Sequence, residues 1–489
     1  MQNYDIQYAN SDIAVMAENY TLPEIDPDAR HTKQLLLLCG IAGLVSVILY
    51  GLTGDRMIAG APFGLVVLLC CLIHTPLAFV VLYSILPLEM VFRFSPFFSA
   101  SKVMGLVVVI SFVLTRLGRS FGLPQIVKWM LVFGLFCLFS TTWAIANTFS
   151  LIGVATILMH IGLIVLLVNT IKSVEMLRLI FWGLVITSAM GAGLLFQGIG
   201  MAWDVGEGGR FAFEDMNPNI LAAQFSVSII AGLYLFSNAH FWGKLVLSGP
   251  ILITGAGLLY TQSRSSLLAL IMAICIAFLL MLKGPNKFIY LALLLMFCAT
   301  TYGGLRFIMA TELLGHQATQ RLRATQRDLG QSGRLDFWKM GAQFFMERPL
   351  HGYGYRNFPI RYGGGLMGVD AHNSYVSLAV ELGIIGMFMF LMIHYLILKR
   401  SLATQIPPLR WLCLALLFFT IFNGMTHTTY NQKEFWYAFG YIIVISQLFS
   451  RNPSQDYPLD NIHDQPLSDY YPDYDRSAYI NDANTGDYT

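Results

Sequence analysis

Long runs of apolar residues follow one another along most of the chain, and the polar stretches between them are mostly short. A helix that crosses a bilayer needs about 20 mostly apolar residues, so this pattern predicts a series of membrane-spanning helices. The predicted spans are 34–52, 59–73, 75–92, 101–117, 125–147, 150–169, 176–198, 218–236, 242–260, 265–283, 287–303, 374–398, 410–428 and 434–450. Because the second and third are short enough to form one hairpin or a re-entrant pair, we expect about 12 to 14 transmembrane helices.

The composition supports a membrane protein. Of the 489 residues, 56% are hydrophobic and only 12% are charged, whereas soluble chains carry about 25% charged residues. The alternating pattern of a transmembrane β-barrel is absent. The predicted fold class is therefore an all-α polytopic membrane protein. The cysteines lie inside apolar spans without metal-ligand spacing, so we expect neither a disulfide framework nor a metal site.

Changes in composition divide the chain into five parts. Residues 1–33 form a polar N-terminal arm without the pattern of a signal peptide. A transmembrane bundle covers 34–303, a large polar loop covers 304–373, and further transmembrane helices cover 374–450. The tail 451–489 is acidic, rich in tyrosine and poor in aliphatic residues, so we expect it to be disordered. It is either a solubilising tail or a cytoplasmic segment for docking or tyrosine phosphorylation.

Basic residues gather at alternate short loops, for example at Lys283 and Lys287. Since cytoplasmic loops are enriched in Lys and Arg, this predicts that both termini lie in the cytoplasm. The connections 199–217, 261–265 and 304–373 then lie on the outer side. The last of these carries nine basic residues, although loops longer than about 60 residues are exempt from the rule.

The first outer connection contains Arg210 and ends in Asn217-Pro218-Asn219 at the start of a span. Asn217 suits the N-cap of a helix and Pro218 its first position. Such a helix start offers free backbone N–H groups and the positive end of the helix dipole to an anion. Arg210 would add a fork of donors that matches phosphate oxygens. The alternative interpretation is that Arg210 is an interfacial residue whose side chain snorkels to the lipid headgroups without a functional role.

The second connection contains Arg264 within Thr261-Gln262-Ser263-Arg264-Ser265-Ser266. A charge between two apolar runs is costly and usually faces a polar cavity. The neighbouring hydroxyl residues are suited to line such a cavity, although snorkelling is again the alternative reading.

The third connection is the large loop. Apolar residues after Arg334 recur with the spacing of an amphipathic helix that lies in the membrane interface. The turn at 352–355 has a glycine–tyrosine pattern that suits either a sugar ring or simple loop packing. His372 stands at the entrance of the next span, and histidine is the side chain that takes up protons near neutral pH.

Further polar residues follow His372. Glu381 would share a helical face with Ser374 and Ser377, and a carboxylate inside a membrane indicates function or a buried arginine partner. His427, near the end of a later span, is a weaker candidate.

Together these segments resemble the O-antigen ligase and polymerase superfamily of bacterial membrane glycosyltransferases. The matching residues are Arg210 with 217–219, Ser263 to Ser266, Ser332 to Trp338, Arg348 to Gly354, His372 to Tyr375, and Glu381 to Gly386. The last four segments are the most specific part, whereas the first 200 residues match only in hydropathy.

The resemblance implies a bundle of the GT-C class with one large periplasmic loop, in a multi-pass protein of the bacterial inner membrane. It implies a glycan donor linked to undecaprenyl diphosphate, attacked without metal or cofactor by an acceptor hydroxyl, with inversion. Arg210 and Arg264, with Arg334 as a helper, would bind the diphosphate. His372 would be the catalytic base, and Asn373, Tyr375 and Glu381 would support it.

The resemblance leaves the acceptor open. A polymerase uses another lipid-linked repeat unit, and a ligase uses the lipid A core. The tyrosine-rich tail favours an O-antigen or exopolysaccharide polymerase, with a chain-length regulator and a tyrosine kinase as partners and no nucleic acid. A lipid-linked glycan transporter or flippase would share the span count, but it would be expected to show paired half-chains or broken helices. A peptidoglycan-type polymerase would need an acid such as Asp336, Glu347 or Asp370.

Overall fold

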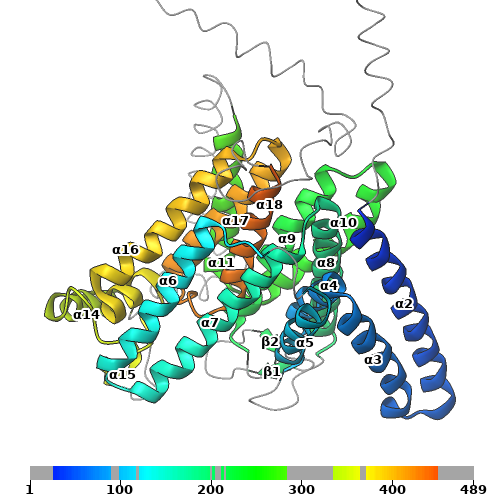
Figure 1. Cartoon of the computed structure of the whole chain (residues 1–489), viewed down its shortest axis with the longest axis horizontal. Helices are drawn as coiled ribbons and strands as arrows, with labels where there is room; N and C mark the ends of the chain where they lie inside the picture. Colours follow the sequence, from blue (N-terminus) through cyan, green and yellow to red (C-terminus); the bar gives the residue numbers. More distant parts are fainter. Residues whose placement is uncertain are drawn as a thin grey trace, which may run out of the picture.

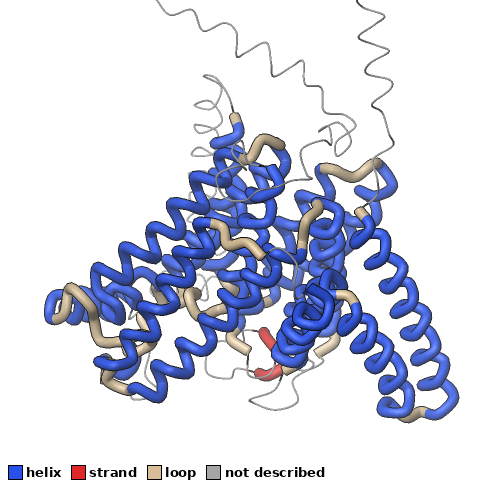
Figure 2. The backbone as a smooth tube through the Cα atoms, in the orientation of Figure 1, coloured by secondary structure: helices blue, strands red, loops and turns tan. Residues whose placement is uncertain are grey.

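The computed structural model describes residues 26–89, 99–116, 121–198, 201–203, 211–213, 216–282, 334–363 and 370–449, and these are almost entirely helical (Figure 2). The first helices are α2 (Pro27–Thr53), α3 (Arg56–Ile73), α4 (Thr75–Ile85), η1 (Leu86–Leu88), α5 (Ala100–Arg116), α6 (Gln125–Ser140), η2 (Thr141–Trp143), α7 (Asn147–Thr170) and α8 (Val174–Phe196). After the strands come α9 (Pro218–Ser237), α10 (Phe241–Tyr260), α11 (Arg264–Met281), α14 (Arg334–Glu347), α15 (Phe358–Arg361), α16 (Ser374–Ala403), α17 (Pro407–Thr426) and α18 (Lys433–Phe449). The strands β1 (Met201–Trp203) and β2 (Phe211–Phe213) pair antiparallel, with Met201 opposite Phe213.

Nine helices in these ranges are long and apolar enough to cross a membrane: α2, α6 with η2, α7, α8, α9, α10, α11, α16 and α17. Shorter apolar helices cover Gly60–Ile73 and Thr75–Leu88, where the sequence predicted a short pair. The predicted all-α polytopic membrane fold is confirmed. The predicted span at 287–303 lies outside the described residues, so the predicted total of helices stays a prediction.

Polar side chains just before the first turn fix where several helices begin. Asp26 accepts a hydrogen bond from the backbone N–H of residue 28, with Pro27 in the first position. Asn217 caps α9 in the same way and is followed by Pro218, as the sequence predicted. Asn373 accepts two backbone N–H groups of α16. Each cap satisfies donors that a helix start leaves free.

The hairpin of α2 and α3 diverges from the other helices at one edge of the molecule (Figure 1). Only 17% of the most apolar window of α2 is buried, and Leu37, Val47 and Leu52 are exposed. Such an apolar surface would be unfavourable in water but is ordinary against lipid tails. The exposure of this hairpin therefore agrees with a membrane environment.

Helix α18 forms the centre of the bundle, and every residue from Glu434 to Ser446 is buried. It packs against α17, α7, α16 and α9. Its aromatic residues contact neighbouring rings, for example Tyr441 against Phe181 and Tyr83. A segment that is buried on all sides must lie inside the bundle rather than against lipid.

Helix α16 is interrupted at Gly383, whose backbone has φ 64° and ψ −164°. The backbone of residues 349–354 fills the interruption. The N–H of Ile384 donates to the carbonyl of Pro349 at 2.8 Å, and the N–H of Gly354 donates to the carbonyl of Glu381 at 2.8 Å. The peptide groups freed by the interruption are therefore satisfied, as an apolar environment requires.

Contacts between the segments that connect the helices show which helix ends lie on the same side of the bundle. On one side, the start of α2 binds the start of α8, through Asp26 with Ser173 and Lys33 with Glu175. On the other side, the starts of α9, α11 and α16 meet the segment after α17. The described parts of the three connections that the sequence placed together therefore share one side.

Candidate functional site

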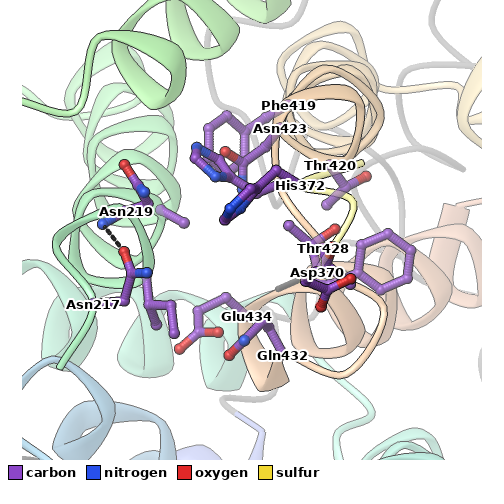
Figure 3. A pocket seen from close by; sticks show the side chains of 15 residues that line it. Asn217, Asn219, Asp370, His372, Phe419, Thr420, Asn423, Thr428, Gln432 and Glu434 are labelled. Carbon is purple, nitrogen blue, oxygen red and sulfur yellow. Dashed lines mark hydrogen bonds between the residues drawn. The ribbon is translucent and has the colours of Figure 1, made fainter. Parts of the chain in front are cut away.

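A cavity of about 180 Å³ lies between the start of α9 and the end of α17 (Figure 3). Four chain segments supply its described lining: Asn217, Asn219, Ile220 and Ala223; Asp370 and His372; Phe419, Thr420 and Asn423; and His427, Thr428, Thr429, Gln432, Glu434 and Phe435. Amides, hydroxyls, imidazoles and carboxylates predominate among these side chains. A polar cavity inside a chain of membrane helices indicates a binding site.

His372 reaches into this cavity from the entrance of α16 (Figure 3). Its backbone φ is +50°, a left-handed conformation that non-glycine residues adopt rarely and mainly where the surroundings impose it. The residues on both sides are fixed. The indole of Trp338 donates to the carbonyl of Ala371 at 3.1 Å, and Asn373 caps α16. The fold therefore fixes the backbone from which the imidazole extends.

The segment before α11 is bound to the cavity by its serines. Ser263 donates to the Asn219 side chain at 2.8 Å, and Ser265 lies 2.6 Å from Nε2 of His427. Arg264 stands between these serines as the first residue of α11. Its side chain is exposed, and it does not line the described cavity wall. The predicted polar surroundings are thus present, with the arginine beside the cavity rather than in it.

The start of α9 supplies the neighbouring wall. The Asn217 side chain accepts the backbone N–H of Asn219 at 2.9 Å, as drawn in Figure 3. The predicted companion Arg210 lies outside the described residues.

Helix α14 carries Arg334, and its existence confirms the helix predicted for the large loop. Residues three and four positions apart share a helical face, so Arg334 lies on the face of Phe337 and Trp338. The Phe337 ring is 6.3 Å from the His372 ring, and Trp338 binds the carbonyl of Ala371. The face of α14 that carries Arg334 is therefore the face that packs against the His372 segment.

Glu381 is fully buried and holds the chain around it. Its carboxylate accepts the backbone N–H of Arg356 at 2.8 Å, the N–H of Phe358 at 3.2 Å and the hydroxyl of Tyr430 at 2.6 Å. The sequence pattern allowed a buried arginine side chain as the partner of Glu381. In the structure its carboxylate binds two backbone N–H groups and a tyrosine hydroxyl instead. Glu381 does not line the described cavity wall, so its contacts are those of a structural residue.

The other residues expected to support the site also make structural contacts. Asn373 is the cap of α16, and the Tyr375 hydroxyl reaches the carbonyl of Ile421 at 3.4 Å. Tyr353 and Tyr355 of the glycine–tyrosine turn are buried, which favours loop packing over a sugar platform.

Sequence reasoning missed Glu434, which lines the cavity and is buried. Gln224 of α9 donates to one of its carboxylate oxygens. The sequence did contain one signal for Glu434, a carboxylate at the start of an apolar run. However, Lys433 precedes it, and such a Lys–Glu pair also fits the start of an ordinary helix. Asp370 and His427, which the sequence ranked low, also line the cavity.

Among the described residues, no group of three or more His, Cys, Asp or Glu side chains is arranged to hold a metal ion.

The fold and this cavity define a polytopic α-helical membrane protein with a polar, histidine-containing site at one end of its bundle. Residues 249–391 match the family model described as O-antigen ligase, so this part of the chain is similar to the O-antigen ligase family that the sequence motifs resemble. The match contains Arg264, Arg334, His372 and Glu381. No curated protein matches the chain.

Proposed function

We propose that this protein transfers a glycan from undecaprenyl diphosphate to an acceptor hydroxyl, with His372 as the catalytic base. The observation that carries the proposal is the position of His372. Its imidazole enters a polar cavity whose other wall is bound to the serines around Arg264. The match to the O-antigen ligase model over residues 249–391 supports the same class of reaction.

In the proposed reaction the His372 imidazole takes the proton of the acceptor hydroxyl, and the hydroxyl oxygen attacks the anomeric carbon of the donor sugar. A new glycosidic bond forms while the bond between the anomeric carbon and the diphosphate oxygen breaks. Attack opposite the leaving group inverts the anomeric centre. A general base placed within reach of the attacking hydroxyl accounts for about 10²–10⁴ of such a rate enhancement.

The undecaprenyl diphosphate leaves with the electron pair of the broken bond, so negative charge grows on its bridging oxygen. Fixed cations that face this oxygen stabilise its departure. We assign this role to Arg264 and Arg210, with help from Arg334. Arg264 starts α11, so the positive end of the helix dipole adds to its charge. These cations would take the place of a divalent metal ion.

We further propose that the cavity side of the bundle faces the periplasm of a bacterial inner membrane. The parity of Lys and Arg in the short loops supports this orientation. The tyrosine-rich tail favours an O-antigen or exopolysaccharide polymerase, and a ligase acting on the lipid A core is the alternative within the superfamily. A chain-length regulator and a tyrosine kinase are the proposed partners of a polymerase.

The interruption of α16 bears on the competing transporter hypothesis, because interrupted spans are typical of transporters. In transporters the interruption leaves backbone groups free to bind a solute. Here residues 349–354 occupy them. The interruption therefore supports the fold and gives no substrate site.

The test uses the purified full-length protein, undecaprenyl-diphosphate-linked repeat units and a chelator, with and without the lipid A core. A ladder of products without the core indicates a polymerase, and a single product that requires the core indicates a ligase. The H372A variant should lose at least about 100-fold in rate while it keeps donor binding. H240A, at an exposed histidine on the opposite side, serves as the matched control. A fully active H372A protein would remove His372 as the base.

A further inference from the structure

The described wall of the cavity carries acid and no base stronger than histidine. Asp370 and Glu434 line it, and no lysine or arginine does so among the described residues. A diphosphate brings concentrated negative charge, which two carboxylates would repel. The wall is instead rich in amides and hydroxyls, which suit a ligand with many hydroxyl groups.

Glu434 is 92% buried, since its exposed fraction is 8%. One of its carboxylate oxygens binds Gln224, whereas the other, Oε2, is buried without a hydrogen-bond partner. Figure 3 shows the side chain at the edge of the hollow that His372 enters. A buried carboxylate oxygen that lacks a donor is costly, and a bound donor removes that cost.

The size of the cavity limits what it can hold. Its volume of about 180 Å³ is below the roughly 300–1,000 Å³ of pockets for drug-sized ligands. That suits one sugar ring better than a whole repeat unit. Phe419 and Phe435 in the wall offer an apolar surface to the carbon face of such a ring.

We propose that this cavity is the acceptor subsite, in which Glu434 accepts hydrogen bonds from hydroxyls of the acceptor's terminal sugar. The donor diphosphate lies outside it, against Arg264. Glu434 is thus a substrate-binding residue that selects and orients the acceptor, while His372, in the same cavity, takes the proton of the attacking hydroxyl. The proposal rests on the proposed function and divides that site into two chemically different halves.

The experiment measures binding of two probes to the full-length protein in lipid nanodiscs. One probe is the oligosaccharide released from lipid-linked repeat units by mild acid, which lacks the diphosphate and can act only as an acceptor. The other is undecaprenyl diphosphate. The E434Q variant keeps the shape of the side chain and a partner for Gln224. We expect about a tenfold loss of oligosaccharide affinity, because a hydrogen bond to a charged acceptor is replaced by a neutral one.

Binding of undecaprenyl diphosphate to E434Q should stay unchanged, which also shows that the variant is folded. R264A should show the reverse pattern. The matched control is E175Q, since Glu175 pairs with Lys33 on the opposite side and does not line the described cavity wall. It should bind both probes as the wild type does.

The outcomes separate the two proposals. If E434Q binds the oligosaccharide like the wild type, or loses both probes equally, the acceptor subsite is wrong while the wild-type product ladder still supports the proposed function. If the wild-type protein forms no product and binds neither probe, the proposed function itself is wrong.

Discussion

His372 and Glu434 show how single residues gain meaning from their position. Both enter one cavity, yet only the histidine stood out in the sequence, because it begins an apolar span at the end of a basic loop. The Asn217 cap was predictable for a local reason, since capping needs only neighbouring residues. Glu434 was not predictable in this way. Its burial and its partner Gln224 arise from two helices that are 210 positions apart.

A prediction at the residue scale concerns Glu347 on α14, outside the membrane spans. The hydroxyl of Tyr353 and the guanidinium of Arg361 donate to its carboxylate. These hydrogen bonds hold the pKa of Glu347 below its ordinary value of 4.5. A carboxyl group with a lowered folded pKa stabilises the fold above the unfolded pKa, and this contribution is lost as the pH falls through the folded pKa.

The wild-type protein should therefore unfold at a higher temperature than E347Q near neutral pH. The difference should shrink once the pH falls below about 4.5. Thermal unfolding of both proteins in detergent, followed by tryptophan fluorescence at several pH values, measures it. A difference that stays constant down to pH 3 would show that protonation of Glu347 is not its cause.

At the scale of elements, the amphipathic helix of the large loop was predictable and the interruption of α16 was not. The spacing of the apolar residues after Arg334 predicts the amphipathic helix directly. The interruption of α16 lies inside a continuous apolar run, where a glycine alone does not distinguish a helix from a break. Glu381 shows the consequence. It was read as a residue on one face of a regular helix, whereas its carboxylate binds the loop that fills the interruption.

Gly383 gives the prediction at this scale. Its positive φ costs a residue with a side chain about 1–3 kcal/mol, and an added Cβ would clash with the Leu350 carbonyl. G383A should therefore lower the unfolding temperature or the yield of folded protein, measured by size-exclusion chromatography and a thermal melt. The matched control is G193A in α8, where no neighbouring atom lies within 4 Å of the added Cβ. Equal stability of the two variants would contradict the role of the interruption.

At the scale of the whole molecule, the parity of basic loops predicted which connections share a side. The contacts between α9, α11, α16 and the segment after α17 agree with that grouping. The meeting of these residues at one cavity could not be predicted. Hydropathy orders the helices along the chain and does not say which of them pack together.

Cysteine labelling in spheroplasts tests the proposed orientation. Met346 on α14 is 75% exposed, and His240 is exposed between α9 and α10 on the opposite side. A membrane-impermeant maleimide should label M346C in intact spheroplasts and should label H240C only after lysis. The natural cysteines among the described residues are mostly buried and should give little background. Labelling of H240C alone before lysis would reverse the proposed orientation.

The filled interruption of α16 also has a consequence for biogenesis. The backbone N–H groups of Ile384 and Ile385 bind carbonyls of residues 349 and 350 rather than carbonyls of their own helix. Until residues 349–354 have folded back against it, α16 therefore lacks the partners that these peptide groups have in the folded protein. Variants that delay this docking present the kind of unpaired polar backbone that lipid tolerates poorly. Docking of residues 349–354 and completion of the α16 span are thus a single folding event.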